Sequence, residues 1–291
     1  MIVVCQHCET RYSVADDKVK GNRFLARCSR CGNIFSAYRP VPVQQIEFID
    51  FSAARSANRA SIIAVSNQKG GVAKTSTSLN VGAALAAAGE KVLLVDFDIQ
   101  ANLSLSLGVR EGRSFYDAVK ARERSMASAI CPTGVPNLSL LPSNKGMILL
   151  NKKYFHAENI EYMLIDRLQS LTDQFDHILI DTPPALGFCT LNALMASNHV
   201  LIPTPCEYLS MHGIHKIEEI IKIVQKRTQS YIVYNILITM HDPRSVASKV
   251  IYKKIHDIFK DRVCKTVIEV DERMKESQIL HQPVHIYDPN S

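Results

Sequence analysis

The sequence contains no stretch of about 18 uncharged apolar residues, which a membrane-spanning helix would need. Its first residues, MIVVCQHC, also lack the basic start and the apolar centre of a secretory signal peptide. These two absences lead us to expect a cytoplasmic protein without a membrane-spanning segment. Disulfide bonds are not expected either, because the cytoplasm keeps thiols reduced, so the eight cysteines need another explanation.

Length and composition are those of an ordinary soluble protein. The 291 residues allow one large core or two modest domains, and 46% of them are hydrophobic while 21% are charged. The net charge of +6 is uneven, because residues 1–40 hold seven Lys/Arg against three Asp/Glu. Such clustering suits a polyanion, although a run of charge is more often only a solvated face.

Four of the cysteines form two C-x-x-C pairs close to the N-terminus. Cys5 and Cys8 make the first pair, Cys28 and Cys31 make the second, and 19 residues separate the pairs. Two such turns supply the tetrahedral four-thiolate shell that Zn²⁺ prefers, and a piece this small needs a metal to fold. We predict a zinc site, with a redox dithiol or an iron site as the alternatives. His7 lies between two of these cysteines, and we expect it to be exposed because the thiolates already fill the shell.

The segment around these cysteines resembles the zinc-ribbon-like fingers found at the N-termini of assorted bacterial proteins, with Tyr12, Arg27 and Phe35 flanking the two turns. We predict a zinc-ribbon domain over residues 1–40, whose charge fits either a nucleic-acid contact or a protein contact. Residues 41–60 begin with prolines and end in small polar residues, which is typical of a linker, with a short strand at Ile46–Phe51 as an option. A second domain should span residues 61–291.

The second domain alternates short apolar runs with amphipathic segments. Continuous β-branched runs separated by helical patterns predict an α/β fold, in which helices cover both faces of a mostly parallel sheet. Ligands of such sheets bind at the carboxyl ends of the strands. The predicted strands are Ile62–Val65, Val92–Val95, Leu138–Leu141, Ile178–Ile180, Val200–Ile202, Tyr234–Ile238 and Val267–Val270.

The stretch IIAVSNQKGGVAKTSTSLN, Ile62 to Asn80, predicts a buried strand, a glycine turn and a helix. The strict P-loop pattern requires glycine where this chain has Gln68 and Ala73, whereas the pattern K-G-G-x-x-K-[ST] fits. Glycines let the backbone approach a phosphate, which the N–H groups of the loop and of the helix N-terminus then cradle. We therefore predict a P-loop NTPase fold in which the nucleotide is bound by Gly70, Gly71, Val72, Ala73, Lys74, Thr75 and Ser76.

Charged and polar side chains follow the loop and two of the strands. Lys74 adds positive charge at the β- and γ-phosphates, and the hydroxyl of Thr75 is placed to bind Mg²⁺. Asp181 ends the strand HILI, so its carboxylate can also hold Mg²⁺. Asp96 and Asp98 end the strand VLLV two residues apart, which puts both carboxylates on the same side. These residues predict a nucleotide site with Mg²⁺ as its metal cofactor.

Five motifs in a fixed order resemble the ParA/MinD family of deviant Walker ATPases over residues 60–291. They are the loop itself, LLVDFDIQANLS, HILIDTPPALG, CEYLSMHGI and NILITMHDPRS. DTPP and TMHDPR are similar to the ParA branch, whereas Ile99 stands where proline is usual and is similar to the MinD branch. The resemblance implies ATP and Mg²⁺ as cofactors, hydrolysis of ATP to ADP and phosphate, and a homodimer that forms when ATP binds.

The resemblance also implies roles for individual residues. The signature lysine of the family, here Lys69, reaches across the dimer interface to the partner's nucleotide, as an arginine finger supplied in trans does. Asp98 positions the attacking water, with Asp96 nearby at the metal, and Asn235 contacts adenine. The switch segment that follows the catalytic aspartate is matched by Gln100 and Asn102.

A second basic stretch lies between Arg244 and Lys275, where nine Lys/Arg face five Asp/Glu. Helical spacing from Ser245 to Phe259 puts a basic stripe on one face and apolar residues on another, namely Val246, Val250, Ile251, Ile255 and Ile258. In the ParA branch the corresponding surface binds DNA without sequence preference. The residues that resemblance and spacing assign to DNA are Lys249, Lys253, Lys260 and Arg273, although Glu269, Val270, Asp271 and Glu272 depart from the family pattern.

Two functions compete. The first is a switch for DNA partitioning or cargo positioning, in which an ATP-bound homodimer binds DNA non-specifically and a partner protein triggers the hydrolysis that releases it. The alternative is a regulatory or polarity ATPase that acts on protein partners without binding DNA and uses the zinc ribbon as a docking module.

Two further members of this family are not expected. A metal-cluster carrier related to the nitrogenase iron protein needs paired cysteines at the dimer axis. The cysteines of the second domain form no such pair, and we expect them to be small buried residues: Cys131, Cys189, Cys206 and Cys264. The sequence also reaches its last residues, IYDPNS, without the amphipathic helix that attaches the MinD branch to membranes, so we expect no membrane contact of that kind.

Overall fold

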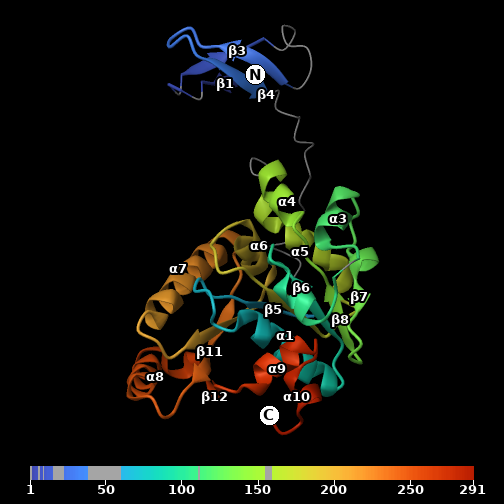
Figure 1. Cartoon of the computed structure of the whole chain (residues 1–291), viewed down its shortest axis with the longest axis vertical. Helices are drawn as coiled ribbons and strands as arrows, with labels where there is room; N and C mark the ends of the chain where they lie inside the picture. The colour runs from blue at the N-terminus through green and yellow to red at the C-terminus, as the bar shows by residue number, and fades with distance from the viewer. Residues whose placement is uncertain are drawn as a thin grey trace. The chain divides into compact units, whose positions relative to one another are not determined.

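The computed structural model describes residues 2–5, 7–8, 10–15, 23–38, 60–110, 112–154 and 159–291. They belong to two compact units, Met1–Glu47 and Phe48–Ser291 (Figure 1). The boundaries predicted at residues 40 and 60 border residues 39–59, which lie outside the described part together with the optional strand at Ile46–Phe51.

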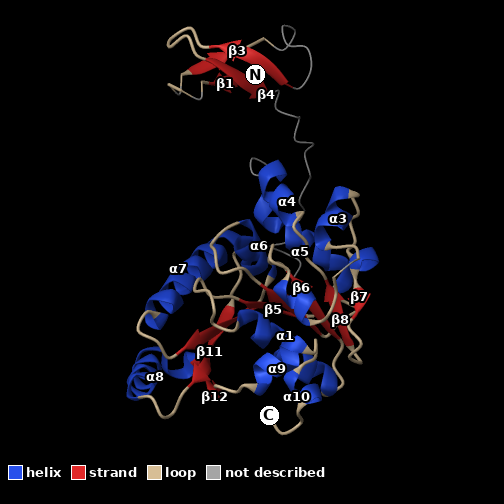
Figure 2. Ribbon diagram, viewed as in Figure 1, coloured by secondary structure: helices blue, strands red, loops and turns tan. Residues whose placement is uncertain are grey.

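The N-terminal unit consists of two antiparallel strand pairs (Figure 2). One C-x-x-C turn joins the strands of each pair. Phe35 and Ala37 are buried against Cys5 and Cys28, and this small cluster is all the apolar core that the described residues of the unit form. The paired strands are β1 Ile2–Val4 with β2 Arg11–Ser13, and β3 Arg23–Arg27 with β4 Ile34–Tyr38.

The second unit is built on one eight-stranded sheet with the order β12-β11-β10-β5-β9-β6-β8-β7. Every neighbouring pair is parallel except β7 and β8, so the predicted mostly parallel α/β sheet is confirmed. The strands are β5 Ser61–Val65, β6 Val92–Asp96, β7 Cys131–Pro132, β8 Leu138–Leu141, β9 His177–Asp181, β10 His199–Pro205, β11 Val233–His241 and β12 Val263–Glu269.

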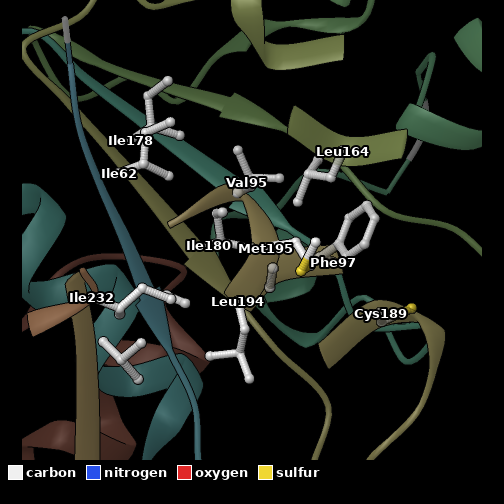
Figure 3. Close-up of a cluster of buried hydrophobic side chains, with 14 of the residues drawn as sticks. Ile62, Val95, Phe97, Leu164, Ile178, Ile180, Cys189, Leu194, Met195 and Ile232 are labelled. Atoms are coloured by element: carbon white, nitrogen blue, oxygen red, sulfur yellow. The ribbon is translucent and has the colours of Figure 1, made fainter. Parts of the chain in front are cut away.

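Both faces of this sheet are covered, which is why most positions of the central strands are apolar. Successive side chains of a strand point to opposite faces. Leu94 of β6 packs in the cluster formed with helix α1, whereas Leu93 and Val95 pack in the larger cluster on the other face. Figure 3 shows part of the larger cluster, where Ile178 and Ile180 of β9 lie beside Ile62 and Val95.

Helices α1 and α2 cover one face, and the larger cluster on the other face includes residues of α3 to α8 (Figure 1). Among the described residues no helix is both long and apolar enough to cross a bilayer. The helices are α1 Lys74–Ala87, α2 Asn102–Ser106, α3 Phe115–Lys120, α4 Met147–Tyr154, α5 Met163–Leu168, α6 Phe188–Ala196, α7 Ser210–Thr228, α8 Val246–Phe259, α9 Arg273–Ile279 and α10 Val284–Tyr287.

Two details differ from the sequence-based expectation. Strand β12 begins at Val263 rather than Val267. Its irregular pairing with β11 ends at Glu269, which is opposite His241, so Val270 lies outside the strand. On α8 the buried face is formed by Ser248, Ile251, Ile255 and Phe259, so the predicted apolar residues Val246, Val250 and Ile258 are exposed instead.

Candidate nucleotide-binding site

The predicted phosphate loop joins the end of β5 to the start of α1. Gly71 has a φ of 70° and Ala73 a φ of 65°, so both adopt the left-handed conformation that glycine accepts most easily. Ala73 is also the N-cap of α1, and no side chain caps that end of the helix. The first N–H groups of α1 are therefore left for an anion, which is the arrangement that binds phosphate.

Lys74 is buried at the base of this loop. Its Nζ donates a hydrogen bond to the carbonyl oxygen of Lys69 at 2.9 Å, which folds the loop around the ammonium group. Burial lowers the pKa of Lys74, and the negative charges of Asp181 and Asp98 oppose that shift. A buried ammonium with carboxylates as its neighbours is well placed to receive further negative charge.

Asp181, at the end of β9, lies directly below the first turn of α1. Its Oδ2 accepts a hydrogen bond from Thr75 Oγ1 at 2.7 Å, and its Oδ1 accepts one from Ser78 Oγ at 3.0 Å. Burial, together with repulsion from Asp96, raises the pKa of Asp181 to about 7. Hard oxygen donors beside a buried carboxylate fit Mg²⁺.

Asp96 ends β6 in register with Asp181, and the structure gives it a different role from the one expected. Its Oδ2 accepts hydrogen bonds from the N–H and the hydroxyl of Ser104 at 2.8 and 2.7 Å, and its Oδ1 accepts one from the Asp98 N–H at 3.2 Å. Burial raises its pKa to about 6. Asp96 lies near the predicted metal ligands, but its oxygens already hold the segment that carries Asp98.

Asp98 lies beyond the end of β6 and is buried. Its Oδ1 accepts a hydrogen bond from the Gln100 N–H at 3.0 Å, which closes a tight turn before α2 begins at Asn102. The predicted switch residues Gln100 and Asn102 therefore follow Asp98 directly, with Gln100 exposed. The carboxylate of Asp98 contributes to the electrostatic environment of Lys74, which places it at the same edge of the sheet.

The ammonium group of Lys69 does not contact Lys74 or Asp181. Its Nζ forms an ion pair with Glu207, which follows the end of β10 in the predicted motif CEYLSMHGI. The N–H of Lys69 donates to Asn67 Oδ1 at 3.1 Å, and the amide of Asn67 donates to the Pro203 carbonyl of β10 at 2.8 Å. The loop is thus fixed to β10 by its backbone, while the ammonium group of Lys69 lies at the surface.

Sequence reasoning missed several residues that hold this site together. Ser78 follows Thr75 by one helical turn, and the run of hydroxyl residues TSTS was the available signal. Thr239 Oγ1 of β11 donates to the Val72 carbonyl at 3.2 Å, and nothing local in the sequence connects these two positions. Gln278 of α9 donates to Ser76 Oγ at 2.8 Å, so the Ser76 hydroxyl already has a protein partner.

The structure does not bring Asn235 into this group. Its Oδ1 contacts His199 Nε2 at 2.9 Å, and its Nδ2 donates weakly to the Arg262 carbonyl at 3.4 Å. His199 is the first residue of β10 and Arg262 precedes β12, so both contacts are at the amino ends of strands. Asn235 is therefore not included in the proposed nucleotide site, although the resemblance implies an adenine contact for it.

The predicted DNA-binding residues separate into two groups. Lys249, Lys253 and Lys260 are exposed at and just beyond α8, along the face opposite its buried residues. Arg273 instead donates to Asp271 and Asp288, with nitrogen–oxygen distances of 2.8 to 3.0 Å. Because two carboxylates neutralise its guanidinium, Arg273 does not extend the basic stripe, and we correct that expectation.

The four cysteines of the N-terminal unit converge as predicted. Their Sγ atoms all lie within 4.8 Å of one another, and the Cys5–Cys31 and Cys8–Cys28 pairs are 3.7 and 3.5 Å apart. Zn–S bonds of about 2.3 Å place the sulfur atoms of a tetrahedral site about 3.8 Å apart, so the cluster fits zinc. His7 is exposed and does not belong to the cluster.

A model described as an AAA domain matches residues 60–234, and one described as a zinc-ribbon domain matches residues 1–36. The sporulation initiation inhibitor protein Soj of Bacillus subtilis is 36% identical over 234 residues, which cover 79% of this chain and 92% of that protein. The chain belongs to the ParA/MinD family of ATPases. The glycine loop with its extra lysine is the family's phosphate loop, preceded here by a zinc-ribbon domain.

Two further proteins are similar to this member of the ParA/MinD family. The chromosome partitioning protein ParA of Myxococcus xanthus is 33% identical, over 79% of this chain and 82% of that protein. A crystal structure named as cobyrinic acid a,c-diamide synthase from Mycobacterium smegmatis, with bound ADP and magnesium, is 32% identical with a TM-score of 0.68. The alignment covers 76% of this chain and 91% of that one.

Proposed function

We propose that this chain is an ATP-driven switch that hydrolyses ATP with Mg²⁺, closes into a homodimer when ATP is bound, and acts in DNA partitioning or cargo positioning in the cytoplasm. The observation that carries the proposal is the convergence of an uncapped helix N-terminus, a buried Lys74 and the Thr75–Asp181 pair at one edge of the sheet. Its relatives Soj and ParA support the assignment.

In this proposal each part of the loop has a separate task. The N–H groups from Gly70 to Ser76 cradle the phosphates, and Lys74 neutralises charge on the β- and γ-phosphates. Thr75 and Asp181 would hold Mg²⁺, which supplies positive charge between the β- and γ-phosphates when bound. Asp98 orients the attacking water, while Asp96 and Ser104 keep its backbone in place.

Lys69 has its task in the dimer. The surface position of its ammonium group supports a role towards the nucleotide of a second copy rather than towards its own. A positive charge placed beside the γ-phosphoryl group as it leaves would lower the barrier to hydrolysis, as an arginine finger does. Hydrolysis would then remove the charge that Lys69 binds and reopen the dimer.

We propose that the ATP-bound dimer binds DNA through the basic stripe of Lys249, Lys253 and Lys260. The three lysines are exposed, and contacts with phosphates alone give binding that depends on salt rather than on base sequence. The four N-terminal cysteines are proposed to hold one Zn²⁺ that stabilises the ribbon.

The proposal is tested by measuring ATP hydrolysis and DNA retention with duplex DNA of unrelated sequences across a salt series. We expect retention that requires ATP, falls steeply with salt and weakens in Lys249→Glu/Lys253→Glu, but is unchanged in Lys222→Glu/Lys226→Glu on α7. Absence of ATP-dependent retention at low salt would defeat the DNA-binding part of the proposal. A partner protein that stimulates turnover would be sought with the DNA-bound dimer.

A second function is favoured by one observation on the same helix. Val246 and Val250 are 76% and 49% exposed beside the lysine stripe, and exposed apolar side chains suit a protein contact better than a phosphate backbone. In that case the chain is a regulatory or polarity ATPase without DNA binding, and its zinc ribbon is a docking module. Normal ATP-dependent dimerisation combined with no DNA retention would select this alternative.

A further inference from the structure

Residues of helices α3 and α4 line an open hollow of about 280 Å³. These two helices lie far from α8 (Figure 1). This α3–α4 hollow has an apolar part and three lysines and no carboxylate among its lining residues. The residues that line it are Tyr116, Lys120, Leu149, Leu150, Lys152 and Lys153.

Hydrogen bonds and close packing hold the walls of the hollow in place. Asn144 Nδ2 donates to Asp117 Oδ2 of α3 at 2.9 Å, and Asn144 Oδ1 accepts from the Gly146 N–H at 2.8 Å, just before α4. Tyr116 packs so closely on Gly146 that a Cβ atom at this glycine would lie 2.2 Å from the tyrosine ring. Any side chain at residue 146 would therefore displace Tyr116, which lines the hollow.

The surroundings of the hollow carry a strong positive charge. Residues 110–153 contain eight Lys/Arg and three Asp/Glu, a net charge of +5. Asp117, which is hydrogen-bonded to Ser114 and Asn144, gives Lys120 a nearby carboxylate, and Glu123 bonds to Arg113 and Ser128. In the described part of the chain, Lys152 forms no ion pair. The lining residues therefore keep a net positive charge, which attracts an anion.

The apolar part points to the kind of anion. Leu149 is 50% exposed, and its neighbour Ile148 on α4 is 51% exposed. A volume of 280 Å³ is below the roughly 300–1,000 Å³ of sites for drug-sized ligands, so it suits one large side chain better than a whole small molecule. Lysines around such a pocket match carboxylates on either side of the inserted side chain.

We propose that the α3–α4 hollow binds an acidic peptide segment of a partner protein, which inserts one large apolar side chain between α3 and α4 and places its Asp or Glu residues against Lys120 and Lys152. Charge complementarity selects the acidic flanks, and the apolar lining selects the anchor. The inference does not depend on ATP hydrolysis or on DNA binding at α8.

Nucleic acid fits this hollow less well. Gly146 packs against the Tyr116 ring and Lys120 Nζ lies over it at 6.0 Å from the centroid, so the ring is not free to stack on a base. The α8 stripe and the hollow also lie near opposite edges of the eight-stranded sheet, where strands about 4.8 Å apart separate them by about 30 Å. A partner peptide and DNA could therefore bind the same chain together.

The proposal is tested by fluorescence anisotropy with the full-length protein and a labelled peptide in which one phenylalanine is flanked on both sides by glutamates. We expect Lys120→Glu/Lys152→Glu to weaken binding by about tenfold or more, since two attractive contacts become repulsive. The matched control Lys222→Glu/Lys226→Glu, which reverses two exposed lysines of α7, should change binding by less than about twofold. Circular dichroism confirms that each variant is folded.

A second peptide separates insertion from bare charge attraction. Replacing its phenylalanine by serine keeps every carboxylate, and we expect about a tenfold loss because the apolar anchor is gone. Equal binding of the two peptides would overturn the proposal, as would equal binding by wild type and Lys120→Glu/Lys152→Glu. Displacement of the peptide by duplex DNA in Lys249→Glu/Lys253→Glu would assign the hollow to nucleic acid and would also overturn it.

Discussion

Glu207 binds the ammonium group of Lys69 within the same chain. The ion pair joins the phosphate loop after β5 to the segment after β10, and the two side chains are 32% and 58% exposed. A lysine that acts on the nucleotide of a second copy cannot keep this partner, because its ammonium group must leave Glu207 to reach the other γ-phosphate. The single chain therefore holds Lys69 in a position that the proposed dimerisation would have to change.

The first prediction concerns this pair. Glu207→Gln removes the charge that holds Lys69, so the variant should dimerise with ATP at a lower protein concentration than wild type. Exposed ion pairs contribute at most about 1 kcal/mol, so the expected shift is about two- to fivefold. Analytical ultracentrifugation with a non-hydrolysable ATP analogue measures it. Glu219→Gln, an exposed glutamate of α7, serves as the control, and weaker dimerisation of Glu207→Gln would contradict the interpretation.

Phe97 is the second target, because it anchors the chain between Asp96 and Asp98. It is fully buried in the larger apolar cluster (Figure 3). It packs edge-on against Phe115, with ring centroids 5.0 Å apart. Phe97→Ala should lower the free energy of unfolding by about 3–5 kcal/mol through lost burial and the cavity that remains. Urea unfolding of the variant measures the loss. Tyr231→Ala, at a side chain that is 69% exposed, should change stability little, and equal losses would refute the argument.

The sequence predicted the strands of the sheet because each is a short apolar run buried on both faces. It also predicted the loop, because glycines and lysines at fixed spacing have a local meaning. Because ligands bind at the carboxyl ends of parallel strands, the sequence also predicted that Asp181, Asp96 and Lys74 lie at the same edge of the sheet.

What the sequence could not supply was the pairing of distant side chains. Lys69 and Glu207 are far apart along the chain, as are Thr239 and Val72, and only the strand order brings each pair together. Helical periodicity misplaced Val246 on α8, because the buried face begins at Ser248, two residues further on and on the opposite side of the helix. Asp271 likewise removed Arg273 from the basic surface through a contact that charge counting does not reveal.

Zinc removal tests the N-terminal unit. The wild-type chain should bind about one zinc ion, and Cys31→Ser should lose it because three thiolates leave a shell incomplete. Elemental analysis of the purified proteins measures the metal. Cys264→Ser, at a half-buried cysteine of the second unit, is the matched control and should keep the zinc. Full zinc content in Cys31→Ser would contradict the four-thiolate site.

The pH dependence of stability should report the buried carboxylates. Burial and repulsion from Asp96 raise the pKa of Asp181 from 3.8 to about 7, so the folded protein retains a proton that the unfolded chain releases. Without nucleotide or Mg²⁺, the free energy of unfolding should therefore fall as the pH rises from about 4 to about 7. Asp181→Asn should flatten this slope, whereas Asp173→Asn at the surface should not. An unchanged slope in Asp181→Asn would mean that another group causes the pH dependence of stability.

The central claim is that the phosphate loop is half of a site that a second copy completes. Mixing Lys69→Ala with Asp98→Asn measures this directly, because only a mixed dimer contains a site with Asp98 from one chain and Lys69 from the other. Each variant alone should hydrolyse ATP poorly, and random pairing should restore about a quarter of wild-type turnover on mixing, since about half the dimers then hold one complete site. No recovery on mixing, with mixed dimers shown to form, would contradict the action of Lys69 across the interface.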